Sequence, residues 1–252
     1  MTDRFSQLEF GETNPKREGS HGEPIRDADH FHKEALQYWL IGDFELALRN
    51  YSRVLEVNNM AFDAWAGQVL MLIELGEYRE AVVWADKAME LFPEHPELLA
   101  VKAVAYARDA KTEQAIAYSD NSISKENVTP RVWLARAEVL LDRRSSVAEN
   151  CISKAVSIAG NITPIIKLEA ARLLHRRGNY AGAIEYLNDV VKVFPKSALA
   201  WYELGCCQAE VGFREAKSTL EQCLRCRPGW NVAEEALRQQ KRKGFFSRLF
   251  GR

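Results

Sequence analysis

The 252-residue sequence lacks the segments that would send it out of the cell or into a membrane. Its start has no positively charged segment followed by an apolar core, which excludes a secretory signal of the usual kind. No uninterrupted apolar run is long enough to cross a bilayer. The balance of 34 basic against 35 acidic residues also excludes the strongly basic composition of a general nucleic-acid binder. We therefore expect a cytoplasmic protein with no nucleic-acid partner.

Residues that could carry out catalysis are present, but they do not form a motif. The sequence has no glycine-rich phosphate loop and no nucleophile elbow. Its five histidines lie in unrelated contexts: His21, His30, His32, His95 and His175. We predict a protein that is not an enzyme, with no catalytic residues, no cofactor and no small-molecule substrate.

Cysteine is scarce, and four of the five cysteines lie near the end of the chain: Cys206, Cys207, Cys223 and Cys226. The last two have the spacing of a zinc half-site. A reduced cysteine also behaves as a small apolar residue, and Cys223 stands where the repeats described below require one. Without an export signal a disulfide is disfavoured. We therefore predict no metal site.

The sequence does contain a repeated unit of about 34 residues. Its clearest copy runs from Phe62 to Pro93, with apolar residues at helical spacing on both sides of Gly76. Glycine ends a helix in the left-handed conformation at little cost, and proline stops the second helix because it has no N–H to donate. Each copy therefore predicts a hairpin of two helices.

Small residues recur at two equivalent positions in successive copies of this unit. The first series is Ala47, Ala81, Ala115, Ala148, Ala183 and Ala216. The second series, seven residues later, is Val54, Ala88, Ser122, Ala155, Val190 and Cys223. Two helices approach to about 8 to 10 Å only where the side chains at their crossing are short. Both series therefore predict close helix crossings. The turn of each hairpin is expected at Gly42, Gly76, Ala110, Arg144, Gly178 and Gly212.

This pattern resembles the tetratricopeptide repeat family. The family's large residue early in the first helix is matched by Phe31, Trp65, Leu99, Trp133 and Trp201, with Lys167 as the exception. The resemblance implies an all-α, right-handed superhelical solenoid of about six hairpins. We place the repeats at 28–61, 62–95, 96–129, 130–162, 163–197 and 198–229. A flexible leader (1–27) precedes them, and a capping helix (230–243) and a basic, aromatic tail (244–252) follow.

In this family the first helix of each hairpin builds the concave wall of the solenoid, which implies a groove that binds a peptide or helix of a partner protein. The partner-binding residues predicted from repeat position are Leu36, Trp39, Leu40, Leu70, Ile73, Val104, Arg131, Arg172, His175 and Arg176. An apolar strip followed by cations suits an amphipathic or extended peptide with an acidic end. The alternative is that some of these side chains, Trp39 above all, belong to the core.

The end of the chain offers a second hypothesis. From Arg238 onward the sequence has six basic residues and no acidic one. On a helix, four large apolar residues would form one stripe, with Arg248 among the cations around it: Phe245, Phe246, Leu249 and Phe250. Such a segment suits an anionic membrane surface or a partner's groove. The alternatives are a disordered, solubilising tail and a tail that docks in the groove. The sequence thus predicts an adaptor or scaffold, recruited in the second hypothesis to a membrane by its tail.

Overall fold

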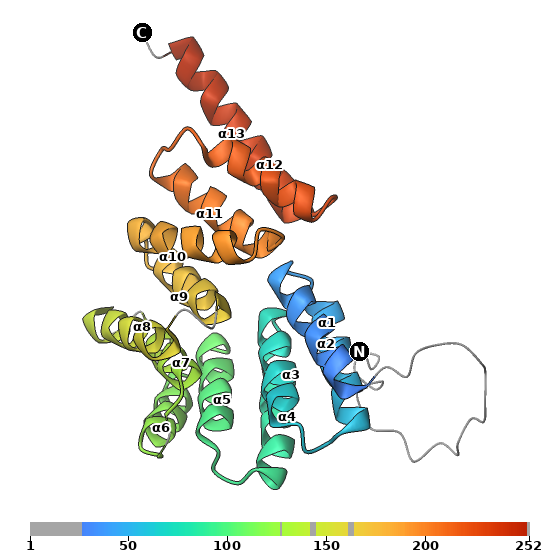
Figure 1. Ribbon diagram of the computed structural model, residues 1–252. Helices are drawn as coiled ribbons and strands as arrows, with labels where there is room; N and C mark the ends of the chain where they lie inside the picture. Colours follow the sequence, from blue (N-terminus) through green and yellow to red (C-terminus); the bar gives the residue numbers. More distant parts are fainter. Residues whose placement is uncertain (1–26, 127, 142–144, 161–163, 251–252) are drawn as a thin grey trace, which may run out of the picture.

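The computed structural model describes residues 27–126, 128–141, 145–160 and 164–250, and only the backbone of residues 145 and 243–250. Every regular element within these residues is a helix, as the sequence predicts (Figure 1). The first three hairpins are α1 (Ala28–Leu40) with α2 (Phe44–Val57), α3 (Phe62–Glu74) with α4 (Tyr78–Leu91), and α5 (Pro96–Arg108) with α6 (Thr112–Ile123). The next three are α7 (Pro130–Leu140) with α8 (Ser145–Ala159), α9 (Pro164–Arg176) with α10 (Tyr180–Val193), and α11 (Ala198–Glu210) with α12 (Ala216–Cys226). Helix α13 (Asn231–Phe250) follows.

The hairpin turns use the glycine positions that the sequence marks. Gly42, Gly76, Gly178 and Gly212 all have φ between 76° and 82°, where a side chain is strained. In the first turn the Asp43 N–H donates to the Tyr38 carbonyl at 2.8 Å, which closes the end of α1. The fourth predicted turn residue, Arg144, lies outside the described residues.

The two series of small residues are buried where the helices cross. All six members of the first series, from Ala47 to Ala216, are at most 1% exposed. Between hairpins, Gly67 of α3 makes room for the ring of Tyr51 on α2, because a Cβ at Gly67 would lie 2.5 Å from that ring. Stability therefore comes from a continuous stack of hairpins, each packed on its neighbours.

The stack curves until its two ends meet. Each first helix from α3 to α9 contacts the first helix of the next hairpin, and α11 also contacts α1 (Figure 1). The first helices thus line the inside of the curve, as the family resemblance implies. The inner side is not the open trough that the sequence suggests, because the sixth hairpin lies against the first.

Helix α13 covers the last hairpin and then continues. It packs against α12 and α11, and its residues Ala233 and Leu237 are buried, whereas Val232 is 52% exposed. The helix runs to Phe250, seven residues beyond the predicted end of the capping helix at 243. Gly244 alone does not stop it, because one glycine costs a helix only about 1 kcal/mol. Across the part of the chain that the structure describes, no helix is long and apolar enough to pass through a membrane.

Candidate functional site: two inner cavities

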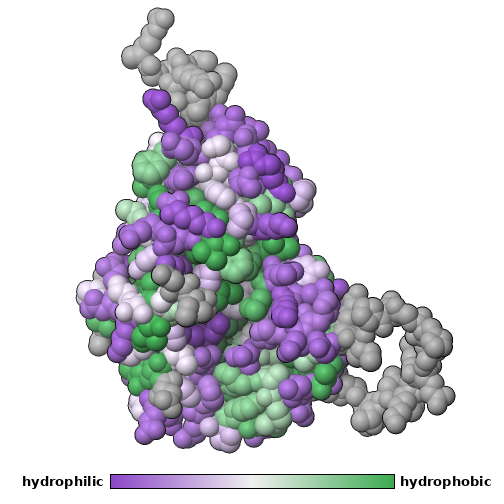
Figure 2. Space-filling view, in the orientation of Figure 1, coloured by the Kyte–Doolittle hydropathy of each residue, from purple (hydrophilic) through white to green (hydrophobic). Residues whose placement is uncertain are grey.

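Two cavities lie on the inner side of the curve, which is hollowed in the space-filling view and carries both apolar and hydrophilic surface (Figure 2). The central cavity has a volume of about 260 Å³ and is lined by residues of α3, α5, α7, α9 and α11. The first-repeat cavity has a volume of about 440 Å³ and lies between α1, α3 and the start of α9. Its apolar lining includes Leu36, Trp39, Leu40, Ile165 and Phe194. Arg131 lines both cavities.

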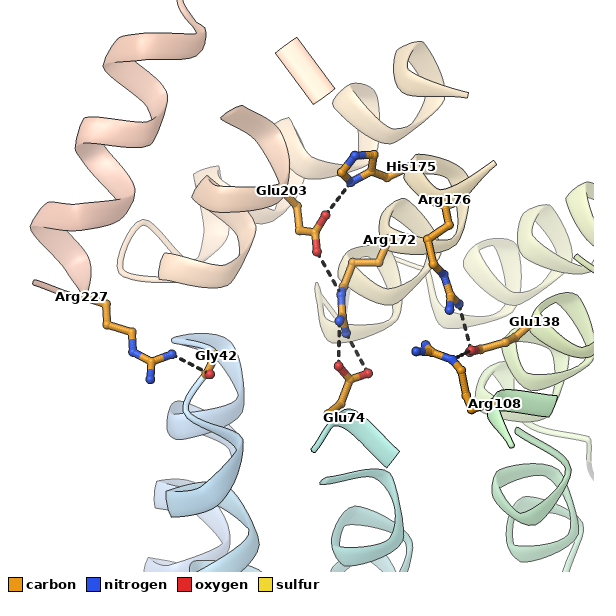
Figure 3. Close-up of polar contacts among 9 residues, drawn as sticks. All are labelled: Gly42, Glu74, Arg108, Glu138, Arg172, His175, Arg176, Glu203 and Arg227. Atoms are coloured by element: carbon orange, nitrogen blue, oxygen red, sulfur yellow. Dashed lines mark hydrogen bonds and ion pairs between the residues drawn. The ribbon is translucent and has the colours of Figure 1, made fainter. Parts of the chain in front are cut away.

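A network of ion pairs crosses the central cavity, and Arg172 lies at its middle (Figure 3). Its guanidinium donates to both carboxylate oxygens of Glu74, at 3.0 and 2.7 Å. Its Nε donates to Glu203 Oε1 at 3.2 Å, and the other oxygen of Glu203 lies 2.7 Å from His175 Nδ1. Arg172 therefore joins three hairpins, since these partners lie on α3, α9 and α11.

Two further arginines share one carboxylate at the edge of this cavity. Arg176 Nη2 lies 2.9 Å from Glu138 Oε1, and Arg108 Nε donates to the same oxygen (Figure 3). All three side chains are at most 35% exposed. Because each comes from a different first helix, the pairs connect α5, α7 and α9.

Arg131 has weaker partners than the other arginines. Its closest carboxylate oxygens are those of Glu97 at 3.6 Å and Glu169 at 3.8 Å, both beyond hydrogen-bond length. One face of its guanidinium lies 5.4 Å from the ring of Trp39. Arg131 is therefore placed where the two cavities meet, held by charge and by the aromatic ring.

Burial and pairing set different pKa values for the carboxyl groups of the network. Burial raises the pKa of Glu169 to about 7, because Arg131 only partly offsets the loss of water and Glu74 adds repulsion. Burial would also raise the pKa of Glu74, but attraction and hydrogen bonds from Arg172 outweigh it and hold that pKa below its usual range. The same holds for Glu203, which is stabilised as a carboxylate by His175 and Arg172.

Comparison with known proteins identifies the repeat. Residues 32–96 and 164–205 match two models of the tetratricopeptide repeat. An uncharacterised protein of Methanocaldococcus jannaschii is 36% identical over 59 residues, which are 23% of this chain and 69% of that protein. The chain belongs to the tetratricopeptide repeat (TPR) family. TPR proteins are typically scaffolds for interactions between proteins.

Solved TPR structures share the fold at low sequence identity. A thermophilic TPR protein of Thermus thermophilus has a TM-score of 0.53 and 18% identity, over 72% of this chain and 99% of that one. The crystal structure of the APC/C hetero-tetramer Cut9-Hcn1 has a TM-score of 0.56 and 15% identity, over 85% of this chain and 43% of that chain. The chain thus covers less than half the length of the matched chain of Cut9-Hcn1. At these sequence identities, both comparisons show a similar fold and nothing more.

All ten predicted groove residues of the TPR solenoid line one of the two cavities. Leu36, Trp39 and Leu40 line the first-repeat cavity, and the central cavity is lined by Leu70, Ile73, Val104, Arg131, Arg172, His175 and Arg176. Trp39 is only 1% exposed and belongs also to the hydrophobic core. It is therefore a lining residue of the cavity and a core residue at the same time.

The predicted partner-binding residues do not include the acidic residues that accompany these cations. Glu74 follows Leu70 by four residues, and residues four apart share a helix face, so this spacing could have identified it. The lining of the central cavity has four arginines, which the four glutamates Glu74, Glu138, Glu169 and Glu203 balance. The surplus of positive charge expected for this cavity is therefore largely cancelled, which weakens the reason for an acidic partner.

The cysteines near the end of the chain and the tail are the other groups that the sequence singled out. Burial raises the pKa of Cys206, Cys207 and Cys223 to about 12, which disfavours the thiolate that a metal requires. No cluster of three or more potential metal ligands occurs among the described residues. The predicted tail residues Phe245, Phe246, Arg248, Leu249 and Phe250 lie on the helical backbone of α13, but their side chains are outside the description.

Proposed function

We propose that this TPR protein is a cytoplasmic adaptor that binds a segment of a partner protein on its inner side, with an apolar side chain of the partner in the first-repeat cavity. The observation that supports this proposal is the lining of that cavity. Leu36 and Leu40 are half-buried and Phe194 is 38% exposed, so apolar surface at this position remains in contact with water. Burying one large apolar side chain there contributes about 1.5 to 3 kcal/mol to binding.

The polar groups of the first-repeat cavity are arranged to orient such a segment. Lys33 and Gln37 are exposed on α1, one turn apart, and Asp63 and Arg131 also line the cavity. These groups offer donors and acceptors to a peptide backbone around the apolar lining. Because the charges in the lining nearly balance, the proposed partner segment is apolar at its anchor rather than strongly acidic.

The substitution Leu36→Glu tests the proposed adaptor function. It places a charge in the apolar lining, and we expect partners bound through this cavity to bind at least tenfold less. The measurement is affinity capture with the wild-type and variant chains, compared by quantitative mass spectrometry. The matched control is Val83→Glu on α4, where the wild-type side chain is 46% exposed and outside both cavities. The proposal fails if both variants retain the same partners as the wild type.

A second candidate function rests on the length of α13. The helix has 20 residues and projects beyond the hairpins, whereas its packed residues Ala233 and Leu237 lie in its first half (Figure 1). The basic residues from Arg238 onward therefore follow the packed part. We propose this part as a contact for anionic lipid, where each cation near the surface contributes about 1 kcal/mol.

Co-sedimentation with vesicles tests the membrane contact. We expect the full chain to sediment with vesicles containing phosphatidylserine, and to be released by raised salt because the attraction is mainly electrostatic. A chain that ends at Leu237 keeps the packed residues of α13 but lacks the basic residues that follow, and it is expected to stay in the supernatant. Neutral phosphatidylcholine vesicles are the control for the lipid charge. Equal recovery of the two chains with anionic vesicles would rule out the contact.

A further inference from the structure

The end of helix α1 is bound by residues that lie far away in the sequence. The Ser197 hydroxyl donates to the Leu40 carbonyl at 2.7 Å. Arg227 Nη1 donates to the Gly42 carbonyl at 2.6 Å (Figure 3) and also to the Ile41 carbonyl at 3.3 Å. The last carbonyls of a helix have no partner within it and carry partial negative charge, so a hydroxyl and a guanidinium are suitable donors. We call these contacts between the first and sixth hairpins the seam.

The seam is closely packed around Arg227. Its guanidinium lies 4.9 Å from the ring of Trp230 and 3.6 Å from an Asp43 carboxylate oxygen. A Cβ on Gly42 would lie 3.2 Å from the Trp230 ring. Gly42 therefore permits two parts of the chain that are far apart in the sequence to approach one another.

A second set of contacts closes the same side of the solenoid deeper inside. Arg172 of α9 binds Glu74 of α3, although the two residues are 98 positions apart. At the first-repeat cavity, Ile165 and Phe194 of the fifth repeat lie across from Leu36 of the first. The first two hairpins thus meet the last two across the two cavities.

The seam differs from the contacts between consecutive hairpins. Consecutive hairpins are joined by the chain and pack through buried side chains such as Tyr51, which is 1% exposed. The seam joins the ends of the solenoid without a covalent connection, and the contacts of Arg227 across it are hydrogen bonds and an ion pair at a partly exposed position. It can therefore separate while each hairpin keeps its own packing.

The central cavity is too small to hold a peptide unless the hairpins separate. At about 260 Å³ it is smaller than the 300 to 1,000 Å³ typical of sites for small ligands, and a peptide of several residues needs more room. We propose that the seam is a latch: Ser197 and Arg227 hold the solenoid closed, and a partner segment reaches the central cavity when the first hairpin moves away from the sixth. The latch rests on the proposed adaptor function for its ligand. Because only open molecules bind the partner segment, the apparent affinity for that segment falls in proportion as the open fraction falls.

Thiol labelling tests the latch without any partner. Val104 lines the central cavity and is 5% exposed, so Val104→Cys places a thiol inside. We expect a maleimide dye to label this cysteine at least ten times faster when Arg227→Ala is also present. The matched control is Arg225→Ala, because Arg225 is exposed and binds Gln222 of its own helix. Chains without Val104→Cys give the labelling of the native cysteines, and peptide mass spectrometry identifies the labelled residue.

Hydrogen exchange distinguishes opening of the latch from unfolding. The N–H groups of Gly42 and Asp43 donate to the Trp39 and Tyr38 carbonyls at the end of α1, which the seam covers, so loss of the seam lets this last turn fray. In Arg227→Ala we expect them to exchange at least ten times faster, with unchanged rates in α7. Equal labelling in the presence and absence of Arg227, or equal acceleration of exchange in all helices, would overturn the latch. If Arg227→Ala opens the seam but Leu36→Glu loses no partner, the latch stands and the adaptor function fails.

Discussion

The substitution Arg172→Met is expected to lower the free energy of unfolding by about 3 to 5 kcal/mol, the usual cost of removing one partner from a buried ion pair. Arg172 binds Glu74 through two hydrogen bonds and Glu203 through a third. Without it, two carboxylates that are at most 13% exposed lose the cation that compensates their burial. Urea unfolding at pH 7, followed by circular dichroism, measures the change.

Neutralising the two carboxylates provides the control for this prediction. In the triple variant with Arg172→Met, Glu74→Gln and Glu203→Gln, no unpaired charge remains, and we expect at least half of the lost stability to return. If the triple variant is as unstable as Arg172→Met alone, the cause is lost packing of the long arginine side chain rather than an uncompensated charge. A loss below 1 kcal/mol for the single substitution would contradict a central role of Arg172 in joining the hairpins.

The hairpins of this TPR solenoid could be predicted from sequence because their determinants are local. Gly76 ends one helix, Ala81 permits a close crossing, and both recur at the same interval along the chain. A periodic pattern needs no knowledge of distant residues. The inner position of residues such as Leu70 and Arg172 also followed from the repeat, since equivalent positions face the same side of the stack.

The closure of the solenoid could not be predicted in this way. It depends on small rotations between successive hairpins that add up over the whole stack, and no local pattern records their sum. The bond between Arg227 and the Gly42 carbonyl joins residues 185 positions apart. The pairing of Arg172 with Glu74 and Glu203 requires the same closure, so the repeat predicted the inner position of Arg172 but not these ion pairs.

Glu169 is expected to make the stability of the protein depend on pH. Burial raises its pKa in the folded protein to about 7 from the ordinary 4.5, so between these values the folded chain binds more protons than the unfolded chain. Stability is therefore expected to fall as pH rises from 4.5 to 7. A shift of one pKa unit corresponds to about 1.4 kcal/mol, so the loss from this residue is about 2 to 3 kcal/mol. It is absent below pH 4.5, where the carboxyl group is protonated in both states.

The substitution Glu169→Gln tests this prediction because glutamine has a similar shape and cannot ionise. Relative to the wild type, we expect the variant to gain about 2 to 3 kcal/mol in unfolding free energy between pH 4.5 and pH 8, measured by urea unfolding. Glu74 and Glu203, whose pKa values are lowered, act in the opposite direction, but they are present in both proteins and largely cancel in the difference. The control is Glu56→Gln at an exposed position of α2, where we expect less than 0.5 kcal/mol at any pH. A difference between Glu169→Gln and wild type that stays constant with pH would show that Arg131 keeps Glu169 ionised in the folded state at acidic pH, contrary to the cost of its burial.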